Sequence, residues 1–286
     1  MRLAMVAGRL ALVRGDRLVD LSGFGDDPMA AFERWDAFID WARTCDGRDE
    51  PLDLQRLGPP VPRPRQVFAI ALNYPPHAAE AGYQPPADPL VFTKFPTCLT
   101  GPYATVELPG DKVDWEVELV VVIGAGGYRI SEDRAWQHVG ALTVGQDLSD
   151  RHTQMLGAPP QFSLAKSFPG FGPIGPVLVS PDELSDPNDL EIVGELNGAV
   201  VQQARTKDMI FAIPELVGRI SAICPLLPGD LIFTGTPAGV GNRMTPPRYL
   251  RPGDELVSRV EGIGELHTLF GRRHYSANDP LGGRLG

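Results

Sequence analysis

The sequence has few cysteines, a deficit of positive charge and no long apolar run. Its 286 residues include only three cysteines, Cys45, Cys98 and Cys224, which are odd in number and widely spaced. Such a set excludes a disulfide framework and a thiolate zinc site, and it fits a reducing compartment. The formal net charge of -10 disfavours nucleic acid and anionic membranes as partners, because binding to either depends on a basic surface.

The apolar segments are too short to cross a bilayer. At the N-terminus, Arg2, Arg9 and Arg14 interrupt the apolar run before the core of a signal peptide could form. With 43% hydrophobic residues, the chain can still bury a sizeable core. We therefore expect a cytoplasmic globular protein whose partner is a small molecule.

Prolines mark the clearest boundary in the chain. The run from Pro59 to Arg65 is extended and poor in backbone donors, which is typical of a linker. We predict a small N-terminal α/β domain over residues 1–60 and a larger domain over residues 61–271. Residues 272–286 have almost no apolar periodicity, so we predict a flexible tail there.

Short β-branched runs between Gly and Pro turns predict most of the strands. Residues 11–21 predict a strand, a tight turn at Gly15-Asp16 and a second strand. Further strands are predicted at residues 67–72, 119–123, 141–144, 177–179, 231–234 and 256–260. Because these strands do not alternate regularly with helices, the pattern indicates a β-rich α+β protein.

Three segments predict helices. Residues 28–43 and 208–221 carry apolar residues at helical spacing, and Pro214 fits the start of the second of these helices. Residues 131–139 open with Ser131 as a candidate N-cap, followed by acids in the first turn.

Two carboxylates, Glu116 and Glu118, stand at the mouth of the apolar run 119–123. Alternation along a strand places both on one face, where they repel each other and are costly to bury without a cation. A divalent ion is the simplest partner, and oxygen ligands favour magnesium, manganese or calcium over zinc or copper. The alternative is an exposed strand edge whose acids are solvated, and the pair alone leaves both open.

Two glycine-rich segments lack the complete motifs of nucleotide-binding loops. Gly124 to Gly127, with Asp147 roughly twenty residues later, mimics a dinucleotide fingerprint, but Arg129 stands where a third glycine or alanine is needed. We interpret this segment as a turn. Thr234 to Gly241 lacks the lysine of a phosphate loop, although its backbone N–H groups could face an anionic ligand.

His77 and Glu80 stand three residues apart, just after the predicted strand 67–72. If Pro76 begins a helix, the two side chains share a face and can form a hydrogen bond. A carboxylate orients an imidazole and raises its basicity, as a water-activating general base requires. A surface pair without a role is the alternative.

Taken together, seven segments resemble the fumarylacetoacetate hydrolase family, in order, from about Val67 to Phe270. These segments are Ala71-Leu72-Asn73-Tyr74 with His77 and Glu80, Phe92-Thr93-Lys94, Asp114-x-Glu116-x-Glu118-Leu119, Gln146-Asp147-Leu148-Ser149-x-Arg151, Ala165-Lys166-Ser167-Phe168, Asp208-Met209-Ile210-Phe211 and Thr234-Gly235-Thr236-Pro237-Ala238-Gly239-Val240-Gly241. Pro75-Pro76, Phe95 and His152 depart from the family pattern at the rim of the site.

The resemblance implies a mixed β-sandwich roll, a homodimer and a bound magnesium or manganese ion. The ligands that it implies for the ion are Glu116, Glu118 and Asp147. It also implies that His77 and Glu80 form a water-activating dyad on a short lid.

The resemblance further implies that Lys166 assists at the metal-bound substrate. Three carboxylates around one divalent ion leave a net negative site that would repel an anionic 2-oxo acid, and Lys166 and Arg151 are the candidates for the compensating cation. Substrate contacts are expected from Lys94, Arg151, Gly235 and Thr236. The alternatives are a surface role for Lys166, an ion pair of Arg151 with Asp147 or Asp150, and a turn-capping role for Thr236.

The implied activity is metal-dependent hydrolysis of a carbon-carbon bond in a β-diketo acid of the acylpyruvate or fumarylpyruvate type, through an enolate that the ion stabilises. The close alternatives are a decarboxylase of oxaloacetate or a related oxo-diacid, and an isomerase or hydratase of 2-oxo-dienoates. A remote alternative is a ligand-binding protein on the same scaffold without catalysis.

Overall fold

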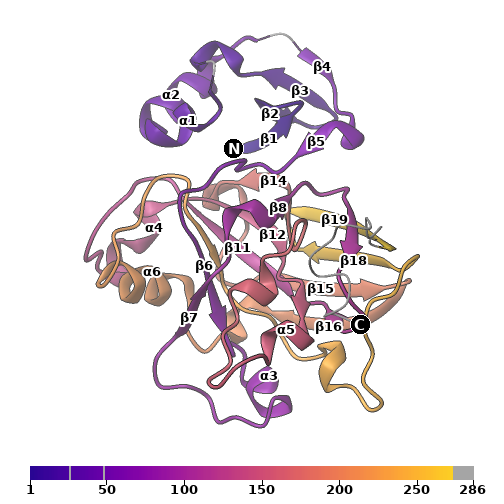
Figure 1. Ribbon diagram of the computed structural model, residues 1–286. Helices are drawn as coiled ribbons and strands as arrows, with labels where there is room; N and C mark the ends of the chain where they lie inside the picture. The colour runs from indigo at the N-terminus through magenta and orange to yellow at the C-terminus, as the bar shows by residue number, and fades with distance from the viewer. Residues whose placement is uncertain (26, 48, 273–286) are drawn as a thin grey trace.

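The computed structural model describes residues 1–25, 27–47 and 49–272, and it is rich in strands (Figure 1). The strands are β1 (Arg2–Val6), β2 (Arg9–Arg14), β3 (Arg17–Asp20), β4 (Asp49–Pro51), β5 (Leu57–Gly58), β6 (Val67–Ala71), β7 (Leu90–Thr93), β8 (Leu99–Thr100), β9 (Thr105–Leu108), β10 (Val113–Asp114), β11 (Val117–Ile123), β12 (Val139–Gln146), β13 (Ser149–Asp150), β14 (Gly172–Val179), β15 (Glu191–Leu196), β16 (Ala199–Arg205), β17 (Leu231–Phe233), β18 (Glu255–Val260) and β19 (Gly264–Arg272).

The α-helices are short, and several 3₁₀ turns join the strands. The α-helices are α1 (Met29–Glu33), α2 (Trp35–Thr44), α3 (Pro75–Glu80), α4 (Ala135–His138), α5 (Arg151–Gln154) and α6 (Ile213–Ser221). The 3₁₀ turns used below are η4 (Glu132–Arg134), η5 (Leu164–Lys166) and η8 (Gly241–Arg243). Among the described residues, none of these helices combines the length and apolar character that a membrane span requires.

A large mixed sheet runs through the molecule in the order β4-β3-β2-β1-β14-β12-β11-β17-β6-β7. Within this sheet, β11 pairs antiparallel with β12 on one side and with β17 on the other. A parallel pairing of β17 with β6 then brings the end of β6 close to β11. The predicted α+β class is therefore confirmed, with antiparallel and parallel pairings in one sheet.

Every residue of β11 is buried, as its continuous apolar sequence predicts. Odd positions such as Leu119 and Val121 join a core with Ile192 and Val260 of the second sheet. That sheet has the order β16-β15-β18-β19-β9. Even positions such as Val120 join a separate core on the opposite face. The strand that carries the candidate carboxylates is thus packed on both faces.

The N-terminal strands extend the large sheet, because β1 pairs antiparallel with β14 and also with β5 (Figure 1). The turn at Gly15-Asp16 joins β2 to β3, as predicted. The predicted division of the chain after residue 60 stays a prediction. Apart from Arg272, which ends β19, the predicted tail lies outside the described residues.

All three helix predictions need correction. The single helix expected at residues 28–43 is two helices, because Arg34 leaves the helical region with φ -127° and ψ 47°. The segment after Ser131 begins with η4 and continues as α4, and the Ser131 side chain makes no capping hydrogen bond. The helix predicted at residues 208–221 begins only at Ile213, and it carries Pro214 in its first turn, as predicted.

Candidate active site

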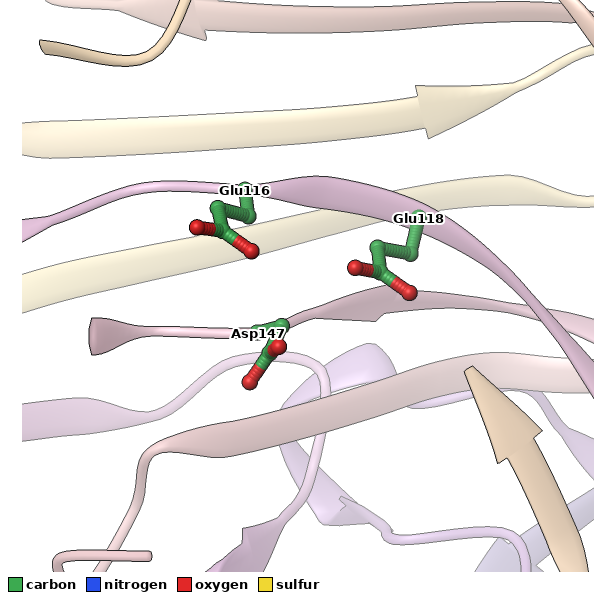
Figure 2. Close-up of side chains that lie close together, drawn as sticks. All are labelled: Glu116, Glu118 and Asp147. Atoms are coloured by element: carbon green, nitrogen blue, oxygen red, sulfur yellow. The ribbon is translucent and has the colours of Figure 1, made fainter. Parts of the chain in front are cut away.

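Three buried carboxylates form the centre of the site. Glu116 precedes β11, Glu118 lies in β11, and Asp147 follows β12 (Figure 2). Each offers an oxygen atom, and these oxygens lie within 4.8 Å of one another. Exposed fractions of 6% for Glu116, 1% for Glu118 and 0% for Asp147 exclude the solvated strand edge.

Backbone pairing holds the three together. The Asp147 N–H donates to the Glu116 carbonyl oxygen at 2.9 Å, so the two acidic segments are tied directly. Figure 2 shows Glu116 and Glu118 hanging from the same side of one strand, above Asp147. This is the result that period-2 alternation predicts for Glu116 and Glu118.

The carboxylates perturb one another strongly. Burial and the charges of Asp147 and Glu116 raise the pKa of Glu118 well above its ordinary value. Burial also acts to raise the pKa of Glu116, but the charges of Lys166 and Arg151 outweigh it and lower that pKa to about 2. Like charges this close, out of water, call for a cation among them.

The donor set fits a hard divalent cation. All of the candidate ligand atoms are carboxylate oxygens, which magnesium and manganese prefer. With Asp114 included, four carboxylates and the cations of Lys94, Arg151 and Lys166 carry a formal net charge of one negative unit when all of them are ionised. A divalent ion would reverse that sign and leave a site suited to one substrate carboxylate.

Lys94 does not lie where a substrate could touch it. Its side chain is 0% exposed, and its Nζ lies 2.7 Å from Asp147 Oδ1. The same Nζ donates to the carbonyl oxygens of Lys166 and Phe171. An ammonium group has three N–H donors, and protein acceptors take all of them. These contacts leave no donor of Lys94 for the substrate contact predicted for it, and they hold Asp147 in place.

We expect Lys94→Met to lower the free energy of unfolding by about 3–5 kcal/mol, because it removes one partner of a buried ion pair. The measurement is denaturant unfolding of the metal-free protein. Lys207→Met is the matched control, since Lys207 pairs with Asp189 at 3.1 Å while 55% exposed. The control should cost under about 1 kcal/mol, and an equal cost in both variants would contradict the buried role of Lys94.

Arg151 is largely committed to the protein. Its Nε lies 2.9 Å from Asp114 Oδ2, and its Nη2 lies 2.7 Å from Glu116 Oε1. Its Nη1 donates to Gln154 Oε1 at 2.9 Å. The acids that pair with Arg151 are thus Asp114 and Glu116. They are not Asp147 or Asp150, the two partners considered from the sequence. The main effect of Arg151 is therefore to hold Glu116 in place, although Arg151 also lines the cavity described below.

Lys166 ends η5 and bridges two of the three acids. Its Nζ lies 2.7 Å from Glu116 Oε2 and 2.6 Å from Asp147 Oδ2. Burial acts to lower the pKa of Lys166, but the charges of Asp147 and Glu116 outweigh it and raise that pKa. At 2% exposure it is no surface lysine.

His77 and Glu80 form the predicted pair on α3, which has prolines in its first turn. His77 Nδ1 lies 2.7 Å from Glu80 Oε1. The carboxylate of Glu80 also accepts from the Gly239 N–H at 3.2 and 3.1 Å, so it is held from two sides. Gly239 has φ +106°, and a Cβ there would lie 2.0 Å from the Val201 carbonyl oxygen, so this backbone approach requires glycine.

The turn after β17 supports the acids more than a ligand. The Gly235 N–H donates to Glu118 Oε2 at 2.8 Å, so the substrate contact expected from Gly235 competes with a hydrogen bond inside the protein. The Thr236 hydroxyl donates to the Val117 carbonyl oxygen at 2.9 Å and accepts from Gln202 Nε2 at 2.8 Å. The hydroxyl proton of Thr236 therefore forms a hydrogen bond within the protein, although Thr236 lines the cavity.

Three residues of the site carried no sequence prediction. Asp114 accepts from Arg151 and from the N–H groups of Gly241 and Asn242. Gln146 and Gln202 accept from the N–H groups of Glu116 and Val117, at 2.9 and 3.0 Å. Asp114 and Gln146 lie inside segments that resemble the family, and that is the only signal that the sequence offered for them.

A cavity of about 950 Å³ opens beside these groups. Its walls include His77, Glu116, Arg151, Lys166 and Thr236. Predicted base, carboxylate and ammonium groups therefore face one space of a size typical for small-molecule sites.

The chain matches known proteins over most of its length. Residues 66–270 match the family model described as fumarylacetoacetate (FAA) hydrolase C-terminal. The mitochondrial oxaloacetate tautomerase FAHD2A of Bos taurus is 42% identical over 209 residues, which cover 72% of this chain and 67% of that protein.

Solved structures agree in fold. A crystal structure from Mycobacterium smegmatis that carries the name HpcE is 51% identical, with a TM-score of 0.91 and coverage of 96% of this chain and 100% of that one. Maleylpyruvate hydrolase from Sphingobium sp. SYK-6, in complex with manganese and pyruvate, is 28% identical, with a TM-score of 0.80 over 96% of this chain and 100% of that one. The chain belongs to the fumarylacetoacetate hydrolase family.

Proposed function

We propose that this protein is a divalent-metal-dependent enzyme that hydrolyses a carbon-carbon bond in a β-diketo acid of the acylpyruvate type. The observation that carries the proposal is the convergence of His77, Lys166 and Glu116 on one cavity, with Glu118 and Asp147 buried behind it. The maleylpyruvate hydrolase neighbour, which binds manganese and pyruvate, supports this reading.

Glu116, Glu118 and Asp147 would hold a magnesium or manganese ion. When bound, the ion supplies a positive charge that draws the carboxylate and 2-oxo group of a substrate and withdraws electrons from them. The side chains around it then determine where protons go.

His77 is placed to act as the base. Its Nδ1 faces Glu80, so the other ring nitrogen, Nε2, is left to accept a proton from water. The resulting hydroxide adds to the distal carbonyl carbon, and the bond to the neighbouring carbon breaks. The electron pair of that bond stays with the 2-oxo acid, which takes up a proton, and the other product is a carboxylic acid.

Lys166 would stabilise negative charge as it develops. It lies at the cavity wall, where its Nζ is 2.7 Å from Glu116 and 2.6 Å from Asp147. A charged donor in a site with little water stabilises an oxyanion more strongly than it would in bulk solvent.

A second candidate is an oxaloacetate tautomerase, which the 42% identical relative favours. Tautomerisation needs a base that moves a proton between carbon and oxygen, and no water adds to the substrate. His77 could serve in that reaction as well, so the dyad by itself does not separate the two activities. Decarboxylation of the same oxo-diacid differs again, because it needs no base to activate water.

Isotope labelling separates the candidates. We expect the protein, supplied with manganese in water enriched in oxygen-18, to release a carboxylic acid from an acylpyruvate with one labelled oxygen. The measurement is mass spectrometry of both products. Turnover of oxaloacetate between its keto and enol forms, with no cleavage of any acylpyruvate, would replace the hydrolase by the tautomerase.

A further inference from the structure

The cavity walls are rich in basic residues, although the chain as a whole is negatively charged. The basic residues in its walls are His77, Lys112, Arg151, His152, Lys166 and Arg243. Glu116 is the one acidic residue in the same walls among the described residues. The whole chain carries a formal net charge of -10, so this concentration of positive charge is local. Such a cavity attracts anions.

Apart from His152, the basic groups fall into two sets. His77, Arg151 and Lys166 already pair with carboxylates, as described above. Lys112 and Arg243 are exposed residues of the cavity walls. Within the described part of the chain, neither of their side chains has an ion pair or a hydrogen bond. Their charges are therefore available to a ligand.

Asp114 fixes the exposed set relative to the paired one. It accepts from the N–H groups of Gly241 and Asn242, which belong to the same 3₁₀ turn as Arg243. It also binds Arg151, whose own N–H donates to the Lys112 carbonyl oxygen at 2.9 Å. One buried carboxylate thus ties the backbone near Arg243 to the group that holds Glu116.

Tyr249 interacts electrostatically with residues of both sets. Burial and the charge of Asp114 raise its pKa, and the charges of Arg151 and Arg243 act against that rise. Asp111 is the other acid whose charge reaches Tyr249. It is exposed, does not line the cavity and forms no ion pair with Arg243 or Lys112 among the described residues.

An apolar wall occupies the space beside these polar groups. It includes Leu90, Val91, Phe92, Met155 and Phe162. The volume of about 950 Å³ lies near the upper end of the range for small-molecule sites. A 2-oxo acid end fills little of it, so a carbon chain with a second polar end can extend along the wall.

We propose that Arg243 and Lys112 bind a second carboxylate of the substrate, distinct from the carboxylate that lies at Glu116, Glu118 and Asp147. The preferred substrate is then a 2-oxo diacid rather than a 2-oxo monoacid. This inference rests on the proposed function, because it takes the first carboxylate to lie at the metal site. It assigns substrate selection to Arg243 and Lys112, which lie outside the segments that resemble the family.

The test compares a 2,4-dioxo diacid with its own terminal monomethyl ester, which has the same chain and lacks the distal charge. We expect the wild-type protein with manganese to show kcat/KM at least about tenfold higher for the diacid, since an ionic hydrogen bond contributes about 1.5–3 kcal/mol. In Arg243→Ala combined with Lys112→Ala, that preference should vanish through loss on the diacid alone. Arg243→Glu should favour the ester.

Arg248→Ala is the matched control. Arg248 is an exposed arginine in the same loop that does not line the cavity, so its variant should keep the wild-type preference. Equal loss on diacid and ester in the double variant, or an unchanged preference, would overturn the subsite.

Calorimetric measurement of binding tests the subsite independently of catalytic activity. If the wild-type protein turns over neither compound, the proposed function fails. The affinities of the same two compounds for the wild-type and double-variant proteins then decide on the subsite. Tighter binding of the diacid that depends on Arg243 and Lys112 supports it, and equal affinities overturn it.

Discussion

Glu118→Gln is expected to lower the affinity for Mn²⁺ by at least about 100-fold without unfolding the protein. Second-sphere changes at metal sites already cost about 10–100-fold, and a direct ligand should cost at least as much. Glu118 also sits buried beside Asp147 and Glu116, whose charges oppose its ionisation. Glutamine keeps the size of the side chain and an oxygen for the Gly235 N–H, and it removes that repulsion.

Glu118→Gln is therefore expected to change stability in opposite directions in the metal-free and the metal-bound protein. The metal-free variant should unfold at the same or a higher temperature than the metal-free wild type. The rise in unfolding temperature on adding Mn²⁺ should be present in the wild type and absent in the variant. Calorimetric titration and thermal unfolding measure both effects. Glu107→Gln, an exposed change on β9, is the control and should preserve the metal response.

A variant that binds Mn²⁺ as tightly as the wild type would remove Glu118 from the ligand set. A metal-free variant that is much less stable than the wild type would show that Glu118 is needed for the fold. Either result would leave the buried charge of this residue in β11 without the explanation proposed here.

His77→Gln is expected to lower kcat for acylpyruvate cleavage by about 10²–10⁴-fold, the usual contribution of a general base. Metal affinity and unfolding temperature should stay close to wild type, because the His77 side chain is hydrogen-bonded to Glu80 and, among the described residues, forms no hydrogen bond with the three central acids. On oxaloacetate, decarboxylation should be far less affected, since no water has to be activated.

His267→Gln provides a matched control for this change. His267 lies 3.1 Å from Glu255 and 3.2 Å from Glu265, so it is a second histidine paired with carboxylates, in β19 and outside the cavity walls. Its variant should keep wild-type kcat. A similar loss in both variants would point to a structural cause, and full activity of His77→Gln would remove His77 from the mechanism.

Local sequence predicted the features that depend on near neighbours along the chain. The apolar run of β11 gives a buried strand, and the one-residue gap between Glu116 and Glu118 places both on one face. The spacing of His77 and Glu80 over one helical turn gives their hydrogen bond. Helix bounds at residues 28–43 were less well predicted, because no glycine or proline marks the break at Arg34.

Long-range contacts were beyond the reach of the sequence. Lys94 meets Asp147 across 53 residues, and Arg151 meets Asp114 across 37. Both cations were predicted to touch the substrate, yet the fold buries their donors against acids and carbonyl oxygens. Which acid a given cation finds depends on strand order and register, and spacing along the chain carries no information about either.

The sequence by itself thus determined the β-rich α+β fold class, the shared face of Glu116 and Glu118, and the His77–Glu80 pair. Through family resemblance it also placed Asp147 with the two glutamates. The tertiary structure decided which cations support the acids and which stay free for a ligand. The reason is physical: side-chain alternation and helical spacing are local, whereas burial and charge pairing depend on how β6, β11, β12 and β17 come together.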